Sequence, residues 1–243
     1  MISYQDAYDR IVEKAACLTP TVEQVPVATA VGRTLARRIT SGVTVPPFDN
    51  TAMDGFALKG DDITKGIISF RCAGRIAAGD DAQSVLASSG ECCEIMTGAP
   101  LPPGLDTVVP VEQSVRAGDQ VSFTVKPSVG DHVRKAGSDF AVGDLVIEAG
   151  TMLNMAHILP LSALGISQVD VFAKINTGFI PTGREIIAAG SGAATGKIYN
   201  SSQPYAVSFL EQAGAVVTCE DIIPDDPALF QAAVTRRMQA GDR

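Results

Sequence analysis

The sequence predicts a mixed α and β protein of more than one domain, because the hydrophobic pattern changes character twice along its 243 residues. The chain begins with an amphipathic helical pattern, short β-like runs broken by Gly, Pro and Asp dominate residues 59–134, and strands alternate with helices from Val169 onward. We expect three domains: a discontinuous N-terminal α/β domain of residues 1–43 and 135–168, an inserted β-rich domain of residues 44–134, and an incomplete α/β domain of residues 169–243.

The N-terminal region should start with a helix capped by Ser3, because apolar residues recur every three or four positions after it and Pro20 lies beyond its end. A second helix is predicted over Ala30–Ile39. This region is too small to bury a core alone, so it must pack against a later segment. The helix predicted over Asn154–Leu164, which ends at Gly165, is the expected partner.

The inserted region contains four clear β-like runs, at Ile67–Cys72, Cys92–Met96, Thr107–Glu112 and Val121–Val125. Side chains alternate across a strand, so the adjacent Cys92 and Cys93 should point to opposite faces of their sheet. The pattern favours a compact β domain over a βαβ unit.

The last region follows an α/β pattern. Lys174–Ile180 and Ala215–Ile223 are predicted strands, and Ser201 or Ser202 should cap the helix between them. Asp226 followed by proline is typical of the N-cap of a further helix. Two parallel strands and two helices bury their surface poorly, so we expect this domain to be incomplete.

Composition and charge exclude several classes of protein. Hydrophobic residues make up 46% of the chain and charged residues 19%, as in ordinary globular proteins. A net charge of −8 argues against nucleic-acid binding, which needs a basic face. No apolar run reaches the roughly 18 residues of a membrane span, and the N-terminus has no signal-peptide pattern. We therefore expect no membrane partner, a cytoplasmic location, and five reduced cysteines.

One loop, Val45–Leu58 (VPPFDNTAMDGFAL), has an unusual composition. Its two prolines fix φ and keep the preceding residues extended, so the loop should be stiff. It presents two carboxylates, Asp49 and Asp54, between strand-like segments. The same residues are also typical of a β-hairpin with an Asp-Gly turn, and the local pattern leaves both interpretations open.

Two further segments combine polar groups with glycine. Met96–Pro100 places the Thr97 hydroxyl beside the Gly98 amide at a strand end, where the pair can hold an oxyanion. An ordinary Gly-Pro turn fits those residues equally well. Arg134–Asp139 places two cations and a carboxylate around a glycine, a composition that is also typical of a solvated loop.

Polar residues also follow the first strand of the last region. Thr182, Gly183 and Glu185 come directly after the strand that is predicted to end at Ile180. In open α/β sheets, ligands bind at the carboxyl ends of strands, so these three residues are candidates for a binding site. Asp226 is a further candidate, although capping a helix explains it equally well.

These segments together resemble the molybdopterin molybdenumtransferase family, which includes MoeA and the E domain of gephyrin. The similar segments are Val45–Leu58, Met96–Pro100, Arg134–Asp139, Pro181–Glu185 and Asp225–Pro227. Ser138 and Arg184 stand where the family has acidic residues. The resemblance implies that residues 169–243 begin a three-layer α/β/α molybdopterin-binding domain, similar to MogA.

The resemblance also implies an activity: insertion of molybdate into adenylylated molybdopterin with release of AMP, requiring Mg²⁺ and carried out by a homodimer on small-molecule substrates. It implies that Asp54, Thr97 and Glu185 are catalytic, and that Asp54 and Glu185 bind the metal. The substrate-binding residues that it implies are Asp139, Asp226, Gly98, Thr182 and Gly183. Carboxylates are the hard oxygen ligands that Mg²⁺ prefers.

The family pattern continues past Arg243 with a glycine-rich loop, the rest of the α/β domain and a C-terminal β domain. We therefore expect this chain to be a truncated form or a fragment. The alternative function is a molybdopterin-binding or dimerisation module without turnover, and a gephyrin-like scaffolding role is a third possibility.

Overall fold

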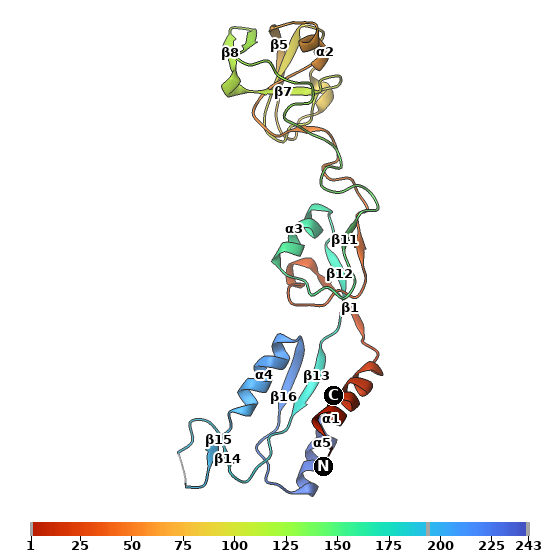
Figure 1. Cartoon of the computed structure of the whole chain (residues 1–243), viewed down its shortest axis with the longest axis vertical. Helices are drawn as coiled ribbons and strands as arrows, with labels where there is room; N and C mark the ends of the chain where they lie inside the picture. Colours follow the sequence, from red (N-terminus) through yellow and green to blue (C-terminus); the bar gives the residue numbers. More distant parts are fainter. Residues whose placement is uncertain (1, 193–194, 242–243) are drawn as a thin grey trace. The chain divides into compact units, whose positions relative to one another are not determined.

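The structure is a computed structural model that describes residues 2–192 and 195–241. The chain forms two compact units. We call Thr40–Val146 the inserted unit, and the residues up to Ile39 and from Ile147 onward the outer unit. Figure 1 shows helices and strands in both units, which confirms the predicted mixed α and β fold. The finer division into three domains stays a prediction.

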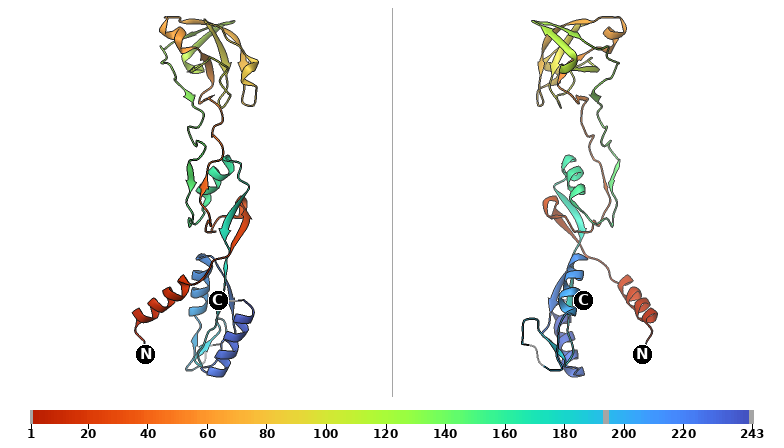
Figure 2. Two further views of the ribbon diagram at one scale, coloured as in Figure 1. Left: turned by 90° about the vertical axis from the view of Figure 1, so that its right-hand side faces the viewer. Right: turned by 60° about the vertical axis from the view of Figure 1, so that its left-hand side comes forward.

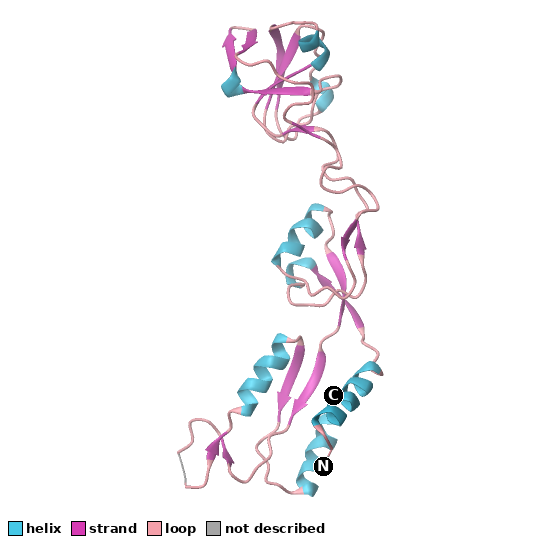
Figure 3. Ribbon diagram, in the orientation of Figure 1, coloured by secondary structure: helices cyan, strands magenta, loops and turns pink. Residues whose placement is uncertain are grey.

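The α-helices of the described residues are α1 (Tyr4–Ala16), α2 (Gly60–Thr64), α3 (Met155–Ala163), α4 (Ser202–Gln212) and α5 (Pro227–Gln239). The strands are β1 (Val22–Pro26), β2 (Ile39–Thr40), β3 (Asn50–Thr51), β4 (Gly55–Leu58), β5 (Ser69–Ile76), β6 (Glu91–Ile95), β7 (Thr107–Pro110), β8 (Ser114–Ala117), β9 (Gln120–Phe123), β10 (Val133–Arg134), β11 (Leu145–Ile147), β12 (Gln168–Phe172), β13 (Ile175–Phe179), β14 (Ile186–Ile187), β15 (Ile198–Tyr199) and β16 (Ala215–Cys219). Figure 3 distinguishes the two classes by colour.

A six-stranded sheet forms the core of the inserted unit, in the order β7-β4-β6-β5-β9-β8. Neighbouring strands are antiparallel except for β5 and β6, which are parallel. Every residue of β4 and β7 is buried, which shows that both faces of the sheet are covered at these strands. Such strands contain nearly continuous apolar residues instead of an apolar and polar alternation.

Two hydrophobic clusters cover the two faces of this sheet. One contains Cys93 and Val108, and the other contains Cys92 and Val109, so successive residues of a strand join opposite clusters. The predicted opposite orientation of Cys92 and Cys93 is therefore confirmed. Burial raises the pKa of each thiol to about 12, which keeps both protonated at neutral pH.

The loop between β3 and β4 is not the turn of a hairpin. β3 pairs with β10, whereas β4 pairs with β6 and β7. The interpretation of Val45–Leu58 as a simple β-hairpin is therefore wrong. β4 begins at Gly55, where an added Cβ would lie 2.1 Å from the Val109 carbonyl oxygen, so the close approach of β4 and β7 requires glycine.

The outer unit begins with α1, which is capped as predicted: Ser3 and Asp6 each accept a backbone N–H of the other in a capping box. The helix predicted over Ala30–Ile39 is wrong. Gly32 adopts a φ of +79°, and Leu35 donates its backbone N–H to the Thr151 carbonyl at 2.9 Å. Pairing with a distant segment therefore outweighs local helix propensity in this stretch.

Two pairs of strands organise the rest of the outer unit. β1 is antiparallel to β12, and β13 is parallel to β16. The predicted helix α3 starts at an Asn154 N-cap and ends before Gly165, whose φ is +72°. Helix α4 packs against β16, and Figure 2 shows the two elements side by side in both views.

The helix starts in the last region differ from each other. The predicted serine cap of α4 is wrong, because the Oδ1 of Asn200 accepts the Gln203 N–H at 3.1 Å and Ser201 makes no side-chain cap. In α5, by contrast, Asp226 is the predicted N-cap, and its Oδ1 accepts the N–H groups of Ala228 (2.8 Å) and Leu229 (3.3 Å).

Within residues 2–192 and 195–241, no helix combines the length and the apolar character that crossing a bilayer requires.

A Gly55→Ala substitution should destabilise the inserted unit, because the new methyl group would overlap the backbone of Val109. We expect a loss of about 1–3 kcal/mol or more, as for other overpacked sites. Urea unfolding measures this loss. The matched control is Gly42→Ala, because nothing lies within 4 Å of its added Cβ. Equal stability of the two variants would contradict the close strand approach.

An Asp226→Ala substitution should lower the stability of the outer unit by about 1 kcal/mol, because α5 loses the acceptor for two N-terminal amides. Asp226→Asn is the matched control, since asparagine caps helices about as well as aspartate does. Thermal unfolding followed by circular dichroism compares the two variants. A loss in the asparagine variant as large as that in the alanine variant would show that the charge matters more than the cap.

Candidate functional site

The structure distributes the predicted site residues over both units. The inserted unit contains Asp54, Thr97, Gly98 and Asp139, and the outer unit contains Thr182, Gly183, Glu185 and Asp226. All eight lie in loops or at helix starts, where a side chain or a backbone amide can reach a ligand. Each group is described within its own unit.

Asp54 and Thr97 form the best-defined contact of the inserted unit. Thr97 donates its backbone N–H (2.7 Å) and its hydroxyl (2.6 Å) to the same carboxylate oxygen, Oδ1 of Asp54. The second oxygen, Oδ2, has no hydrogen bond or ion pair among the described residues. The carboxylate is thus fixed by one oxygen and presents the other to a ligand.

The backbone holds these two residues together. Gly98 donates its N–H to the Thr51 carbonyl at 2.9 Å, and Thr51 donates its N–H to the Ala99 carbonyl at 3.3 Å. The turn that contains Gly98 has a φ of +78° at this residue, which favours glycine. The 96–101 segment and the loop that carries Asp54 are therefore joined on both sides of the Asp54–Thr97 contact.

Hydrogen bonding keeps Asp54 charged. The hydroxyl and the backbone N–H of Thr97 hold the pKa of the Asp54 carboxyl below its ordinary value, because both donors favour the ionised form. Arg75 adds a weaker electrostatic contribution in the same direction. Asp54 is therefore an anion at neutral pH, able to bind a cation or to accept a proton.

A second carboxylate of the same loop, Asp49, binds the segment that carries Asp139. It accepts the Lys135 ammonium group at 2.7 Å and the Ala136 N–H at 2.8 Å. Asp139 itself forms an ion pair with Arg134. Sequence reasoning noted Asp49 as an exposed carboxylate but missed this contact, because the partners lie 86 and 87 positions away.

The predicted residues of the outer unit follow β13. Gly183 donates its N–H to the Ile223 carbonyl at 3.0 Å, and the adjacent Thr182 forms a parallel bridge with Ile223. Gly183 has a φ of +145°, a conformation that side chains rarely adopt. The exposed side chain of Glu185 has no hydrogen bond or ion pair within the described part of the chain, and so remains available to a ligand.

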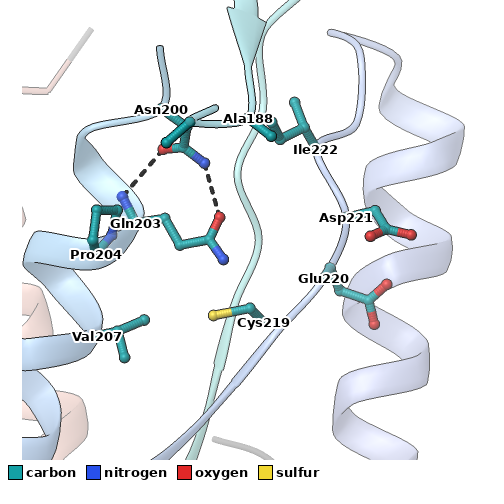
Figure 4. Close-up of a pocket in the computed structure, with 10 residues that line it drawn as sticks. Ala188, Asn200, Gln203, Pro204, Val207, Cys219, Glu220, Asp221 and Ile222 are labelled. Atoms are coloured by element: carbon teal, nitrogen blue, oxygen red, sulfur yellow. Dashed lines mark hydrogen bonds between the residues drawn. The ribbon is translucent and has the colours of Figure 1, made fainter. Parts of the chain in front are cut away.

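A cavity of about 680 Å³ lies elsewhere in the outer unit, at the start of α4 and beyond the end of β16 (Figure 4). Its lining residues are Ala188, Ala189, Asn200, Gln203, Pro204, Val207, Cys219, Glu220, Asp221 and Ile222. In Figure 4 the Gln203 amide lies between α4 and Cys219. This volume is typical of small-molecule sites.

Glu220 at the wall of this cavity is neutralised. Its carboxylate contacts Arg236 and Arg237 of α5, each at 2.7 Å. The Arg236 guanidinium is the main cause that holds the pKa of Glu220 below its ordinary value. The paired carboxylate is therefore a poor metal ligand. Asp221 and the Nε2 group of Gln203 remain available to a ligand in the cavity, because the Oε1 of Gln203 already accepts a hydrogen bond from the Asn200 amide at 2.8 Å.

Sequence reasoning missed this cavity, although one signal pointed to it. The rule that ligands bind at the carboxyl ends of strands was applied only to the residues after β13. Glu220 and Asp221, directly after β16, satisfy the same rule. Placing the predicted strand end at Ile223, beyond the observed end at Cys219, hid those residues inside an expected strand.

The described residues contain no group of three or more His, Cys, Asp or Glu side chains arranged to hold a metal ion. Asp54 still fits Mg²⁺, because it is ionised and its Oδ2 is without a protein partner in the described structure. Mg²⁺ is commonly bound by one or two carboxylates together with substrate phosphates and water, so a single protein ligand in one unit is sufficient for such a site.

Comparison with known proteins confirms the resemblance. A family model described as the MoeA N-terminal region (domain I and II) matches residues 2–165, and one described as a probable molybdopterin binding domain matches residues 178–243. The chain is 30% identical to molybdopterin molybdenumtransferases of Synechococcus elongatus and Haemophilus influenzae, over 100% of its own length and 62% and 59% of theirs.

The fold agrees with the same assignment. A crystal structure of a molybdopterin biosynthesis MoeA protein from Pyrococcus horikoshii covers 99% of this chain with a TM-score of 0.86 and 26% identity, and the match spans 65% of that protein. The present chain thus spans about three fifths of the length of these relatives. A family match over residues 2–165 covers more than half of the sequence, and the chain therefore belongs to the MoeA family of molybdopterin biosynthesis proteins.

Proposed function

We propose that this protein acts in molybdenum cofactor biosynthesis, in the insertion of molybdate into adenylylated molybdopterin with release of AMP. The observation that carries the proposal is the Asp54–Thr97 contact, in which one carboxylate oxygen is fixed and the other has no partner in the described structure. Relatives of this chain are named molybdopterin molybdenumtransferase, which supports the proposal.

In this proposal, Asp54 and Glu185 are each a ligand of Mg²⁺ within their own unit. The ion would supply electrostatic stabilisation of the phosphoanhydride that is cleaved. Asp54 suits this role because it is ionised and is fixed in one orientation by both donors of Thr97. Thr97 is then a residue that orients the carboxylate, and the adjacent amide of Gly98 is already bonded to Thr51. We therefore assign the orientation of Asp54, instead of direct oxyanion binding, to the 97–98 turn.

The cavity of the outer unit is the proposed site for the pterin end of the substrate. It lies within the region matched by the molybdopterin-binding family model. The start of α4 supports an anionic group there, because the N-terminal amides of a helix favour negative charge. Neutralisation of Glu220 by Arg236 and Arg237 supports it further, because it removes one of the two carboxylate charges of the lining and leaves only that of Asp221.

Thr182, Gly183, Asp139 and Asp226 remain proposed substrate-binding residues. For Asp226 the helix cap already uses one carboxylate oxygen, because both amide donors bond to Oδ1. Oδ2 of Asp226 is the atom left for a substrate. Asp139 shares its carboxylate with Arg134, so a substrate would meet this ion pair instead of an isolated charge.

A homodimer is part of the proposal, and α1 supports it. None of its residues is buried, and its apolar side chains include Tyr4 at 83% and Ile11 at 68% exposure. A helix with an apolar stripe normally buries that stripe against another element. A cytoplasmic location is also proposed, and five cysteines without a disulfide support it.

The second candidate function is a molybdopterin-binding module without turnover. It is favoured by one observation: the proposed pterin cavity is formed entirely by the outer unit, whereas Asp54 and Thr97 belong to the inserted unit. Binding of the pterin therefore does not require the carboxylate that the proposed reaction requires.

An Asp54→Asn substitution should reduce AMP release from adenylylated molybdopterin, in the presence of Mg²⁺ and molybdate, by about 100-fold or more, because the fixed anionic oxygen is lost. Release of AMP is followed by chromatography, and binding of the substrate by calorimetry. The matched control is Asp61→Asn, an exposed aspartate of the same unit whose side chain forms no contact in the described structure.

Three outcomes distinguish the candidates. AMP release that falls in Asp54→Asn and not in Asp61→Asn supports the proposed reaction. Binding without AMP release by the unchanged chain supports the binding module. Equal AMP release by both variants and the unchanged chain would contradict the role of Asp54.

A further inference from the structure

We propose that Asp49 is a positioning residue, whose carboxylate fixes the 134–139 segment against the loop that carries Asp54 and keeps Lys135 away from Asp139. The inference rests on the proposed function insofar as Asp54 and Asp139 act on the substrate. Asp49 itself would touch neither the substrate nor the metal.

Three segments that are distant in the sequence meet at Asp49. Its Oδ2 accepts the Lys135 ammonium group at 2.7 Å, and its Oδ1 accepts the Ala136 N–H at 2.8 Å. Its backbone carbonyl accepts the N–H of Leu101 at 3.0 Å, just after the turn that contains Thr97. One residue therefore connects the loop that carries Asp54 with both of its neighbouring segments.

The position of these bonds explains why a side chain is needed. The ladder between β3 and β10 ends at Arg134, which pairs with Asn50. Backbone bonds resume only at Gly137, whose N–H binds the Pro46 carbonyl at 2.9 Å, and at Asp139, whose N–H binds the Val45 carbonyl at 3.0 Å. Between these points the Asp49 carboxylate is the acceptor for the Ala136 amide, so it replaces the missing ladder bond.

The charges of the segment form two separate pairs. Lys135 pairs with Asp49, and Arg134 pairs with Asp139. The hydrogen bond from Lys135 and then the Ala136 amide hold the pKa of Asp49 below its ordinary value, so its charge persists at neutral pH. If Asp49 were removed, two cations on adjacent residues would compete for the single carboxylate of Asp139. Asp139 would then be less available to a substrate.

Both effects should be measurable in the intact 243-residue chain. An exposed ion pair contributes little to global stability, so the expected effect of Asp49→Ala is local. Hydrogen exchange followed by mass spectrometry should show that the amides of residues 134–140 exchange about tenfold faster or more in Asp49→Ala, with no change in β4 and β6. Asp49→Asn should give an intermediate rate, because its amide oxygen still accepts the Ala136 N–H.

The matched control for exchange is Asp131→Asn. Asp131 likewise accepts one backbone N–H in the same unit, that of Ser128 at 2.7 Å, but it lies outside the Asp49 network. Its variant should leave the exchange of residues 134–140 unchanged. Unchanged exchange of residues 134–140 in Asp49→Ala would overturn the proposal, whatever the protein does with its substrate.

A separate experiment tests the electrostatic part of the proposal. Its expected result would not follow if Asp49 only held the segment in place. Asp49→Ala should lower AMP release, and the Asp49→Ala/Lys135→Ala double variant should recover part of it, because Asp139 is then left with Arg134 alone. Exchange of residues 134–140 should stay fast in both variants. A double variant no more active than Asp49→Ala would overturn the charge-separating role.

These readouts separate the failure of the inference from the failure of the proposed function. An unchanged chain that neither binds adenylylated molybdopterin nor releases AMP would overturn the proposed function, and with it the role of Asp49 in presenting Asp139. The exchange experiment would still decide whether Asp49 holds the segment in place.

Discussion

The candidate site of the inserted unit depends on one interaction: a single oxygen of Asp54 accepts both hydrogen-bond donors of Thr97. Strand β4, which follows Asp54, is buried along its whole length in the sheet, and strand β6, which precedes Thr97, is its neighbour in that sheet. The exposed contact is thus supported by a rigid core. Because both donors converge on Oδ1, the orientation of Oδ2 is fixed without any group occupying it.

The close packing of this core restricts which residues can occupy particular positions. Gly55 cannot accept a side chain because Val109 approaches its backbone, and the adjacent Cys92 and Cys93 must fit two different hydrophobic clusters. The loop that carries Asp49 and Asp54 lies outside the sheet, and its conformation is held by hydrogen bonds and ion pairs instead of by hydrophobic packing. The proposed catalytic residues lie where this loop joins the buried sheet. Rigid elements such as these strands position functional groups better than loops alone.

The outer unit combines a cavity with residues that present charge at its surface. Arg236 and Arg237 neutralise Glu220, whereas Asp221 in the same lining has no hydrogen bond or ion pair among the described residues. Arg184, which stands where the family has an acidic residue, adds a positive charge next to Glu185. If Glu185 binds a metal ion, the positive charge of Arg184 beside it repels that ion and weakens its binding.

Much of the fold could be predicted from the sequence, because many of its signals are local. The caps at Ser3 and Asp226 act within three residues, and alternation along one strand placed Cys92 and Cys93. The signals that failed are those that distant partners override. Leu35 pairs with Thr151 instead of forming a helix, and β3 pairs with β10 instead of with β4.

In the candidate site, too, local features could be predicted and contacts between distant residues could not. The types of residue in it were predictable from composition and resemblance, whereas the contacts were not, because Thr97 lies 43 positions from Asp54 and Lys135 lies 86 from Asp49. The cavity was missed because the end of β16 was placed four residues too late, beyond Glu220 and Asp221. A small error in a strand boundary therefore concealed its polar wall.

The pH titration of the Asp54 carboxyl carbon by nuclear magnetic resonance tests the central claim most directly. A lowered pKa means that the stabilisation by Thr97 is complete above the ordinary value of 3.8 and is lost as the pH falls through the lower value of the folded protein. The account predicts a midpoint below 3.8 for Asp54 and a change in the Thr97 amide signal at the same pH. A midpoint at the ordinary value, with no response of the Thr97 amide, would contradict it.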